Sequence, residues 1–198
     1  MALLSVGVGG YGLFLVFTGF QYVPPPIMNS HFFTPLGIQI HIAASSLALA
    51  VGAFQFWRPL RMRRPMLHRW NGRVYVAACV LGGLAGGAIA LYSSAGLVAN
   101  WGFFVLAVLW VPFTLLALAA AMRRDFVAHR RWMIRSFALT FGAVTLRLYL
   151  PVGVMTVGFD TAYPIIAWLA WVPNLIAVEI WLRAKPAGTA PGAARAVA

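Results

Sequence analysis

Two histidines stand in similar short motifs, and residues of these types could hold a metal-containing cofactor. The motifs are HRWNGR at 68–73 and HRRWMIRS at 129–136, and a long apolar run follows each one. If both runs are helices that start from the same side of a membrane, His68 and His129 lie at similar depth. Two neutral imidazoles can hold the iron of a b-type haem from its two faces. The arginines placed to bond the haem propionates are Arg69, Arg130 and Arg131.

The same two motifs also fit a simpler interpretation. Arginine and tryptophan are common where a membrane helix meets water, and a histidine beside them needs no further role. Under this alternative the motifs anchor two spans at the membrane surface and bind no cofactor. The sequence leaves both interpretations open.

A second polar set lies inside long apolar runs, where such side chains face protein or water rather than lipid. Its members are His41, Arg147, Asn174 and Glu179. A charge near the middle of a span costs at least about 2.5–3.5 kcal/mol on insertion scales, so Arg147 needs a partner. We expect Asn174 to lie level with it, and Glu179 to lie about 12 Å away in depth. The set forms either a polar clamp between the last two spans or an anion site.

His41 has a different expected role. Ser45 follows it by one helical turn. This spacing predicts a hydrogen-bonded histidine inside the protein.

Membrane helices must position all of these residues. The chain has 198 residues, of which 62% are hydrophobic and 9% charged, which is too apolar for a water-soluble domain. Each apolar run is close to the roughly 20 residues that cross a bilayer as a helix. We therefore predict an all-α, polytopic membrane helix bundle with about six transmembrane helices. The runs are 2–20, 35–57, 74–92, 101–121, 136–157 and 162–182.

The positive charge is unevenly distributed along the chain. Six arginines lie in 58–73 and five in 123–135, whereas 21–34, 93–100 and 158–163 contain no lysine or arginine. Basic loops are retained in the cytoplasm, so both termini are predicted to be cytoplasmic. The net charge of +12 is then explained by membrane topology and attraction to anionic lipid rather than by nucleic acid.

Small residues mark one packing face. GGLAGG at 82–87 places glycine pairs four residues apart, and this spacing lets helix backbones approach closely. Cys79, the only cysteine, lies in the same run and is expected to be an inert core residue. The acids Asp125, Asp160 and Glu179 are too few and too scattered for carboxylate-based hydrolysis or calcium binding.

Several motifs together resemble a known family. FQFW, HRWNGRVY, HRRWMIRS, TLRLYLP and WVPNL occur in this order in a bacterial family of predicted membrane proteins, catalogued as domain of unknown function 2306. The resemblance implies a multi-pass protein of the bacterial inner membrane and brings no activity. In layout alone, the histidine pair is similar to that of the membrane cytochrome b ferric reductases.

Two functional hypotheses follow. The first is a haem-b electron-transfer or reductase subunit that uses His68 and His129. The alternative is a non-redox transporter or accessory membrane subunit with an interior polar path around Arg147. We predict one transmembrane domain over 1–184 and a disordered cytoplasmic tail over 185–198. The lipid bilayer is the expected partner, and a homo-oligomer or a larger membrane complex stays open.

Overall fold

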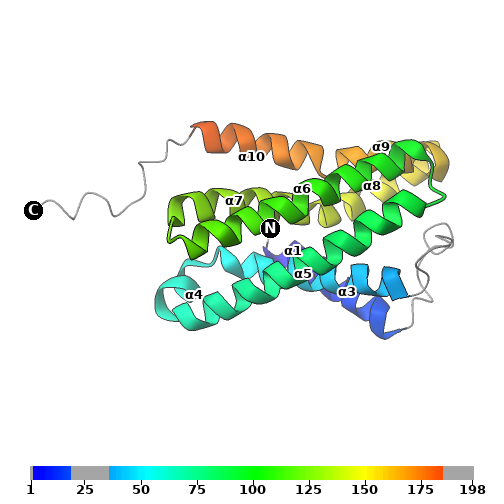
Figure 1. Cartoon of the computed structure of the whole chain (residues 1–198). Coiled ribbons are helices and arrows are strands. Elements are labelled where there is room, and N and C mark those ends of the chain that lie inside the picture. Colours follow the sequence, from blue (N-terminus) through cyan, green and yellow to red (C-terminus); the bar gives the residue numbers. More distant parts are fainter. Residues whose placement is uncertain (1, 19–35, 185–198) are drawn as a thin grey trace, which may run out of the picture.

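The computed structural model describes residues 2–18 and 36–184, and regular secondary structure within these ranges is entirely helical (Figure 1). The helices are α1 (Ala2–Phe17), α3 (Leu36–Gln55), α4 (Arg58–Arg63), α5 (Pro65–Tyr92), α6 (Leu97–Met122), α7 (Phe126–Thr140), α8 (Gly142–Val157), α9 (Phe159–Leu169) and α10 (Val172–Ala184).

Five helical segments are long and apolar enough to cross a membrane. Two of them are composite, since α7 with α8 and α9 with α10 each make one segment, and the apolar α1 is shorter. These segments confirm the predicted polytopic helical bundle. The sixth span, the side on which the termini lie and the single domain over 1–184 stay predictions. The loop at 19–35 and the tail at 185–198 lie outside the described residues.

The basic segments gather at one end of the bundle. Helix α4, the turn between α6 and α7, and the end of α10 all lie there (Figure 1). We call this the basic end. The turn between α5 and α6 and the turn at Gly158 lie at the opposite end.

The glycines of α5 form the predicted packing face, and they serve two neighbouring helices. A Cβ on Gly82 would lie 2.7 Å from Ser45 Oγ, and one on Gly86 would lie 2.6 Å from His41 Nδ1, so this pair accommodates α3. The pair Gly83 and Gly87 faces Val111 and Ala107 of α6 instead. Small residues therefore let α5 approach both neighbours closely.

Two membrane segments are interrupted at the same level of the bundle. Phe126–Val157 divides at Phe141, and Phe159–Ala184 divides at residues 170–171. A Cβ on Gly142 would lie 3.2 Å from that of Trp171, so the two interruptions face each other. The sequence-based runs 136–157 and 162–182 did not include these breaks.

Side chains satisfy the backbone groups around the interruptions. Pro173 lacks an N–H and its ring would clash with the carbonyl of Leu169, which explains why α9 ends there. Asn174 Nδ2 donates to the carbonyl of Ala170 at 3.0 Å and to Thr145 Oγ1 at 3.2 Å. The Thr145 hydroxyl donates to the same Ala170 carbonyl. The last two segments are thus joined where both helices break.

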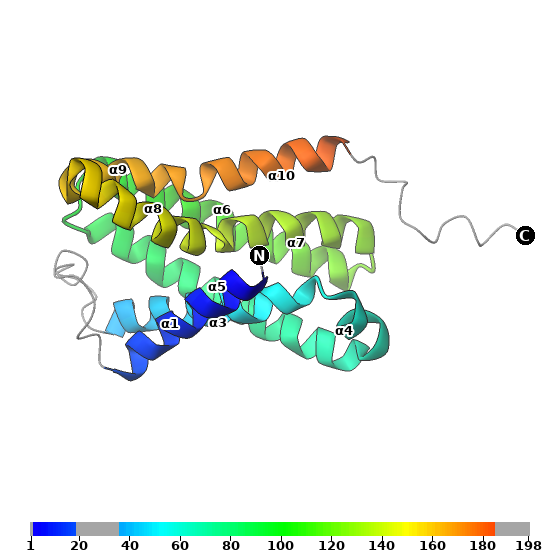
Figure 2. The ribbon, with the colours of Figure 1, turned by 180° about the vertical axis from the view of Figure 1, so that it is seen from behind.

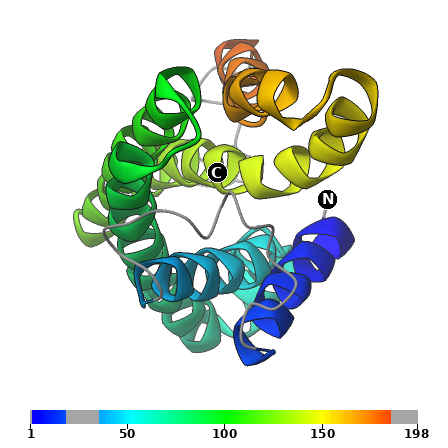
Figure 3. The same ribbon diagram turned by 90° about the vertical axis from the view of Figure 1, so that its right-hand side faces the viewer.

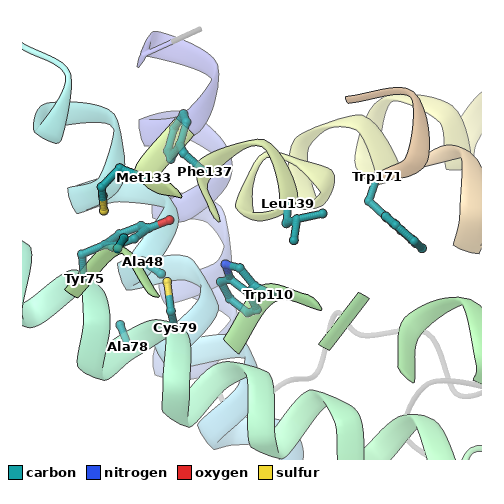
Figure 4. Packing of buried hydrophobic residues seen from close by; sticks show 10 residues of the cluster. Ala48, Tyr75, Ala78, Cys79, Trp110, Met133, Phe137, Leu139 and Trp171 are labelled. Carbon is teal, nitrogen blue, oxygen red and sulfur yellow. The ribbon is translucent and has the colours of Figure 1, made fainter. Parts of the chain in front are cut away.

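The apolar core lies between these breaks and the basic end (Figure 4). Tyr75 and Cys79 of α5 are fully buried in it, and the free thiol of Cys79 fits its predicted place as a core residue. Other members are Ala48, Ala78, Trp110, Ala117, Met133, Phe137, Leu139 and Trp171.

Candidate functional site

A cavity of about 660 Å³ lies between α1, α3, α5, α6, α8 and α9. Asn100 and Trp110, both on α6, line it, so it extends about 15 Å along that helix at a rise of about 1.5 Å per residue. It begins near the opposite end of the bundle and ends at Trp110 and Thr140. Its walls are mainly apolar, and its volume is in the range of pockets that bind small molecules, roughly 300–1,000 Å³.

Arg147 of α8 is the charged residue of this cavity. It is half-buried, and its Nη1 donates to the carbonyl of Ala143 in its own helix at 2.9 Å. The charge of Arg147 acts on His41, and both His41 and Tyr11 line the cavity with it. Among the described residues, no carboxylate lies within ion-pair distance of Arg147. Its guanidinium therefore keeps most of its five N–H donors for another partner.

Arg147 does not pair with Glu179, in keeping with the difference in depth expected from the sequence. Glu179 pairs with Arg135 of α7, whose Nε and Nη2 donate to its two carboxylate oxygens at 2.5 and 3.0 Å. The Arg135 guanidinium also lies 4.8 Å from the ring centroid of Trp132. Glu179 therefore lies nearer the basic end than a pairing with Arg147 would require.

Asn174 bonds Thr145, two residues before Arg147 on α8, and not Arg147 itself. Asn174 lies at the level of the helix interruptions, where it bonds Thr145 and the carbonyls of Ala138 and Ala170. Of the predicted interior polar set, only His41 and Arg147 share the cavity.

His41 fits the predicted role of a hydrogen-bonded interior histidine. Its Nδ1 lies 2.8 Å from the carbonyl of Gly82 and 3.4 Å from Ser45 Oγ. A carbonyl only accepts hydrogen bonds, so Nδ1 carries the proton and Nε2 of the neutral ring is an acceptor. Among the described residues, one cation, Arg147, and one histidine, His41, thus line the cavity. The His41 ring is held by the backbone of α5.

The structure also brings His68 and His129 near each other, at the basic end. Their charges interact, and His129 Nδ1 lies 2.8 Å from the carbonyl of Ala117. His68 Nδ1 is buried and has no hydrogen-bond partner in the described part of the chain. Neither histidine lines the 660 Å³ cavity.

The arginines predicted to bond the haem propionates differ in their exposure. Arg69 and Arg130 are exposed, and Arg131 is half-buried, with its charge acting on Glu179. In the described ranges, no group of three or more His, Cys, Asp or Glu side chains could hold a metal ion.

A buried network of hydroxyl groups closes the cavity towards the basic end, and the sequence analysis missed it. Tyr75 Oη lies 2.8 Å from Ser136 Oγ and 2.9 Å from Thr140 Oγ1. Trp110 Nε1 donates to Thr140 Oγ1 at 2.8 Å, and Thr114 Oγ1 lies 2.6 Å from Ser136 Oγ. The network joins α5, α6 and α7. Single hydroxyl groups are common in membrane helices, so only the spacing of Ser136 and Thr140, one turn apart, hinted at it.

Comparison with known proteins supports the assignment drawn from the motifs. Residues 38–182 match the family described as predicted membrane protein (DUF2306). The chain belongs to this family. The matched residues extend from α3 into α10, and α1 precedes them. No curated protein and no solved structure matches the chain. The family description names no activity, so a function has to be argued from the site.

Proposed function

We propose that this integral membrane protein binds a small, mainly apolar monoanion in the cavity around Arg147. The observation that carries the proposal is a guanidinium that lines a cavity and, within residues 2–18 and 36–184, bonds only a carbonyl of its own helix. This proposal narrows the second hypothesis from the sequence, a non-redox membrane protein with an interior polar path around Arg147, to the binding of an anion. We place the protein in a bacterial inner membrane, with its basic end towards the cytoplasm.

The need for an anion follows from the cost of an isolated charge. An arginine far from bulk water is tolerated when it pairs with another group or with water, and no described carboxylate pairs with Arg147. A carboxylate could accept two parallel N–H bonds from the guanidinium, which is a strong and directional contact. An anionic ligand would therefore supply the missing partner.

The rest of the lining favours an apolar ligand body. Phe103, Leu106 and Leu150 line the cavity, and Asn100 lies towards its opposite end. Asn100 Oδ1 is buried and has no hydrogen-bond partner among the described residues, so it is a further acceptor for a ligand or for water. We propose binding rather than passage, because the packed network around Tyr75 closes the cavity on one side.

A chain-length series tests this proposal. Purified protein in nanodiscs is titrated with carboxylates from hexanoate to palmitate and with the primary alcohols of the same lengths, and binding is measured by isothermal titration calorimetry. We expect at least one carboxylate to bind about tenfold or more tightly than its alcohol, because a hydrogen bond to a charged group contributes about 1.5–3 kcal/mol.

The variants assign that preference to one residue. Arg147→Gln should abolish it, while Arg123→Gln, which alters an exposed arginine at the basic end, should preserve it. Equal binding of carboxylate and alcohol at every length would overturn the proposal.

A b-type haem at His68 and His129 is the second candidate. A histidine that ligates a metal commonly donates its other ring nitrogen to a carbonyl, and His129 Nδ1 has such a contact with Ala117. The approach of His68 adds a second imidazole, whose buried Nδ1 has no partner in the described chain.

The colour of the purified protein separates the two candidates. A haem with these ligands should give a Soret band that is lost in both His68→Ala and His129→Ala and kept in Arg147→Gln. A colourless protein from cells supplied with haem precursor would end this candidate and leave the anion proposal intact.

A further inference from the structure

The cavity around Arg147 reaches the molecular surface between α1 and α8. Most of its described lining residues are buried or half-buried, and the exposed ones are Gly7, Tyr11 and Pro151. Tyr11 is 49% exposed. Gly7 and Tyr11 belong to α1 and Pro151 to α8, and these helices lie side by side at one edge of the bundle (Figures 2 and 3). The cavity therefore opens sideways, between two helices.

The surface around this opening is suited to lipid rather than to water. Large apolar side chains on the same two helices are exposed, including Phe14, Leu148 and Val152. Arg147 is the only charged residue that α1 and α8 contain. An opening in such a surface faces the hydrocarbon of the bilayer.

Arg147 lies beside the opening. It is one helical turn before Pro151 on α8, and it lines the same cavity as Tyr11 of α1. An anion bound to the guanidinium would therefore have its remaining atoms close to the gap between α1 and α8. This placement fits a head group held inside the cavity and a chain that leads out to the bilayer.

We infer that the ligand is a single-chain carboxylate of the bilayer, which enters between α1 and α8 and places its head group on Arg147. The inference rests on the proposed anion site and adds the class of ligand and its route. A short carboxylate dissolved in water shares the head group but does not need the lateral opening.

Position 7 offers a way to close the opening without disturbing the fold. A Cβ on Gly7 meets no atom within 4 Å, so a large side chain fits there. Gly10 is the matched control, because it is also exposed, also has no atom within 4 Å of a Cβ, and does not line the cavity. The variants are Gly7→Trp and Gly10→Trp in nanodiscs, titrated with palmitate and with hexanoate.

We expect Gly7→Trp to bind palmitate about tenfold or more weakly than Gly10→Trp does. For hexanoate, we expect the affinities of the two variants to differ by less than about threefold. Equal palmitate binding by the two variants would overturn the lateral route. Equal weakening of palmitate and hexanoate by Gly7→Trp would also overturn it, because it would indicate simple filling of the cavity. In both cases a preference for carboxylates that depends on Arg147 would leave the proposed function standing.

A chemical version of the same experiment closes the opening after folding. In Gly7→Cys and Gly10→Cys, a bulky maleimide reacts only at the new cysteine, because Cys79 is fully buried. The modification should weaken palmitate binding in Gly7→Cys alone. An unchanged affinity in modified Gly7→Cys would count against the lateral route even if Gly7→Trp failed to fold.

Discussion

Two polar sites of the bundle, the network around Tyr75 and the surroundings of Arg147, differ in how their side chains are bonded. Towards the basic end, Tyr75, Ser136 and Thr140 bond one another in a tightly packed core. Towards the opposite end, Arg147 lies at a cavity, and its own helix is its only hydrogen-bond partner in the described part of the chain. In a bilayer, a polar group whose bonds are all made inside the protein stabilises the fold, whereas a charged group that lines a cavity and has spare donors can bind a ligand. A polar residue within an apolar run can therefore either stabilise the fold or bind a ligand.

The largest expected effect is in the network around Tyr75. Tyr75→Ala removes a fully buried ring and leaves a void, which should lower the free energy of unfolding by about 3–5 kcal/mol. Tyr75→Phe keeps the ring and loses only the bonds to Ser136 and Thr140, so about 1 kcal/mol is expected. The measurement is SDS-induced unfolding in mixed micelles. If Tyr75→Ala and Tyr75→Phe both lowered the free energy of unfolding only slightly and by the same amount, the region around Tyr75 would not be tightly packed.

A smaller effect is expected where α5 approaches α3. In Gly86→Ala the new Cβ would lie 2.6 Å from His41 Nδ1, so either the helix or the ring must shift. Overpacking of this kind costs about 1–3 kcal/mol. Gly7→Ala, at the lateral opening, has no atom within 4 Å of its Cβ and should leave stability nearly unchanged. The midpoint of thermal unfolding in detergent compares the two, and equal midpoints would mean that His41 is not held tightly against α5.

The ion pair of Glu179 gives a smaller expected effect, a coupling energy of about 1 kcal/mol. Its carboxylate contacts Arg135, so a double-mutant cycle of Arg135→Leu and Glu179→Leu should show coupling of about that size. The cycle of Arg147→Leu and Glu179→Leu should show none, because those residues do not touch. The readout is again SDS-induced unfolding, and coupling in the second cycle would restore the clamp expected from the sequence.

The smallest effect is expected at Arg147 itself. Arg147→Met replaces an unpaired charge by an apolar side chain of similar length, so the ligand-free protein should unfold within about 0.5 kcal/mol of the original or at higher denaturant. Its measurement is chemical unfolding with and without added palmitate, which should stabilise only the original protein. A large loss of stability without ligand would show that Arg147 has a structural partner.

The architecture was predictable because a bilayer demands long apolar helices, and the runs at 35–57 and 101–121 correspond to α3 and α6. GGLAGG was informative for a similar reason, since close helix approach needs small residues whatever the neighbour. The bonding partners of Asn174 and Glu179 were not predictable, because they depend on how the last two segments pack and on where each is interrupted. Pro173 signalled one of the interruptions, whereas Phe141 is an ordinary apolar residue and signalled nothing.

The cavity was only partly predictable. Arg147 and His41 stood out as polar residues within apolar runs, so their interior position could be expected from the cost of exposing them to lipid. The contribution of Tyr11 and Gly7 to the cavity could not be predicted, because it depends on how α1 lies against α8. Hydroxyl groups such as that of Thr140 were missed because one alone is inexpensive in a membrane helix. Their grouping appears only in three dimensions.

The bonds between the last two membrane segments also bear on how the chain enters the bilayer during synthesis. Arg135 and Thr145 lie on the earlier segment, and their partners Glu179 and Ala170 lie on the later one. Until the later segment has been made, Arg135 lacks its carboxylate. Insertion of the two segments together, as a helical hairpin, is therefore the most favourable route into the bilayer for the emerging chain. A chain that ends at Gly158 would leave the translocation machinery with a span that lacks its polar partners.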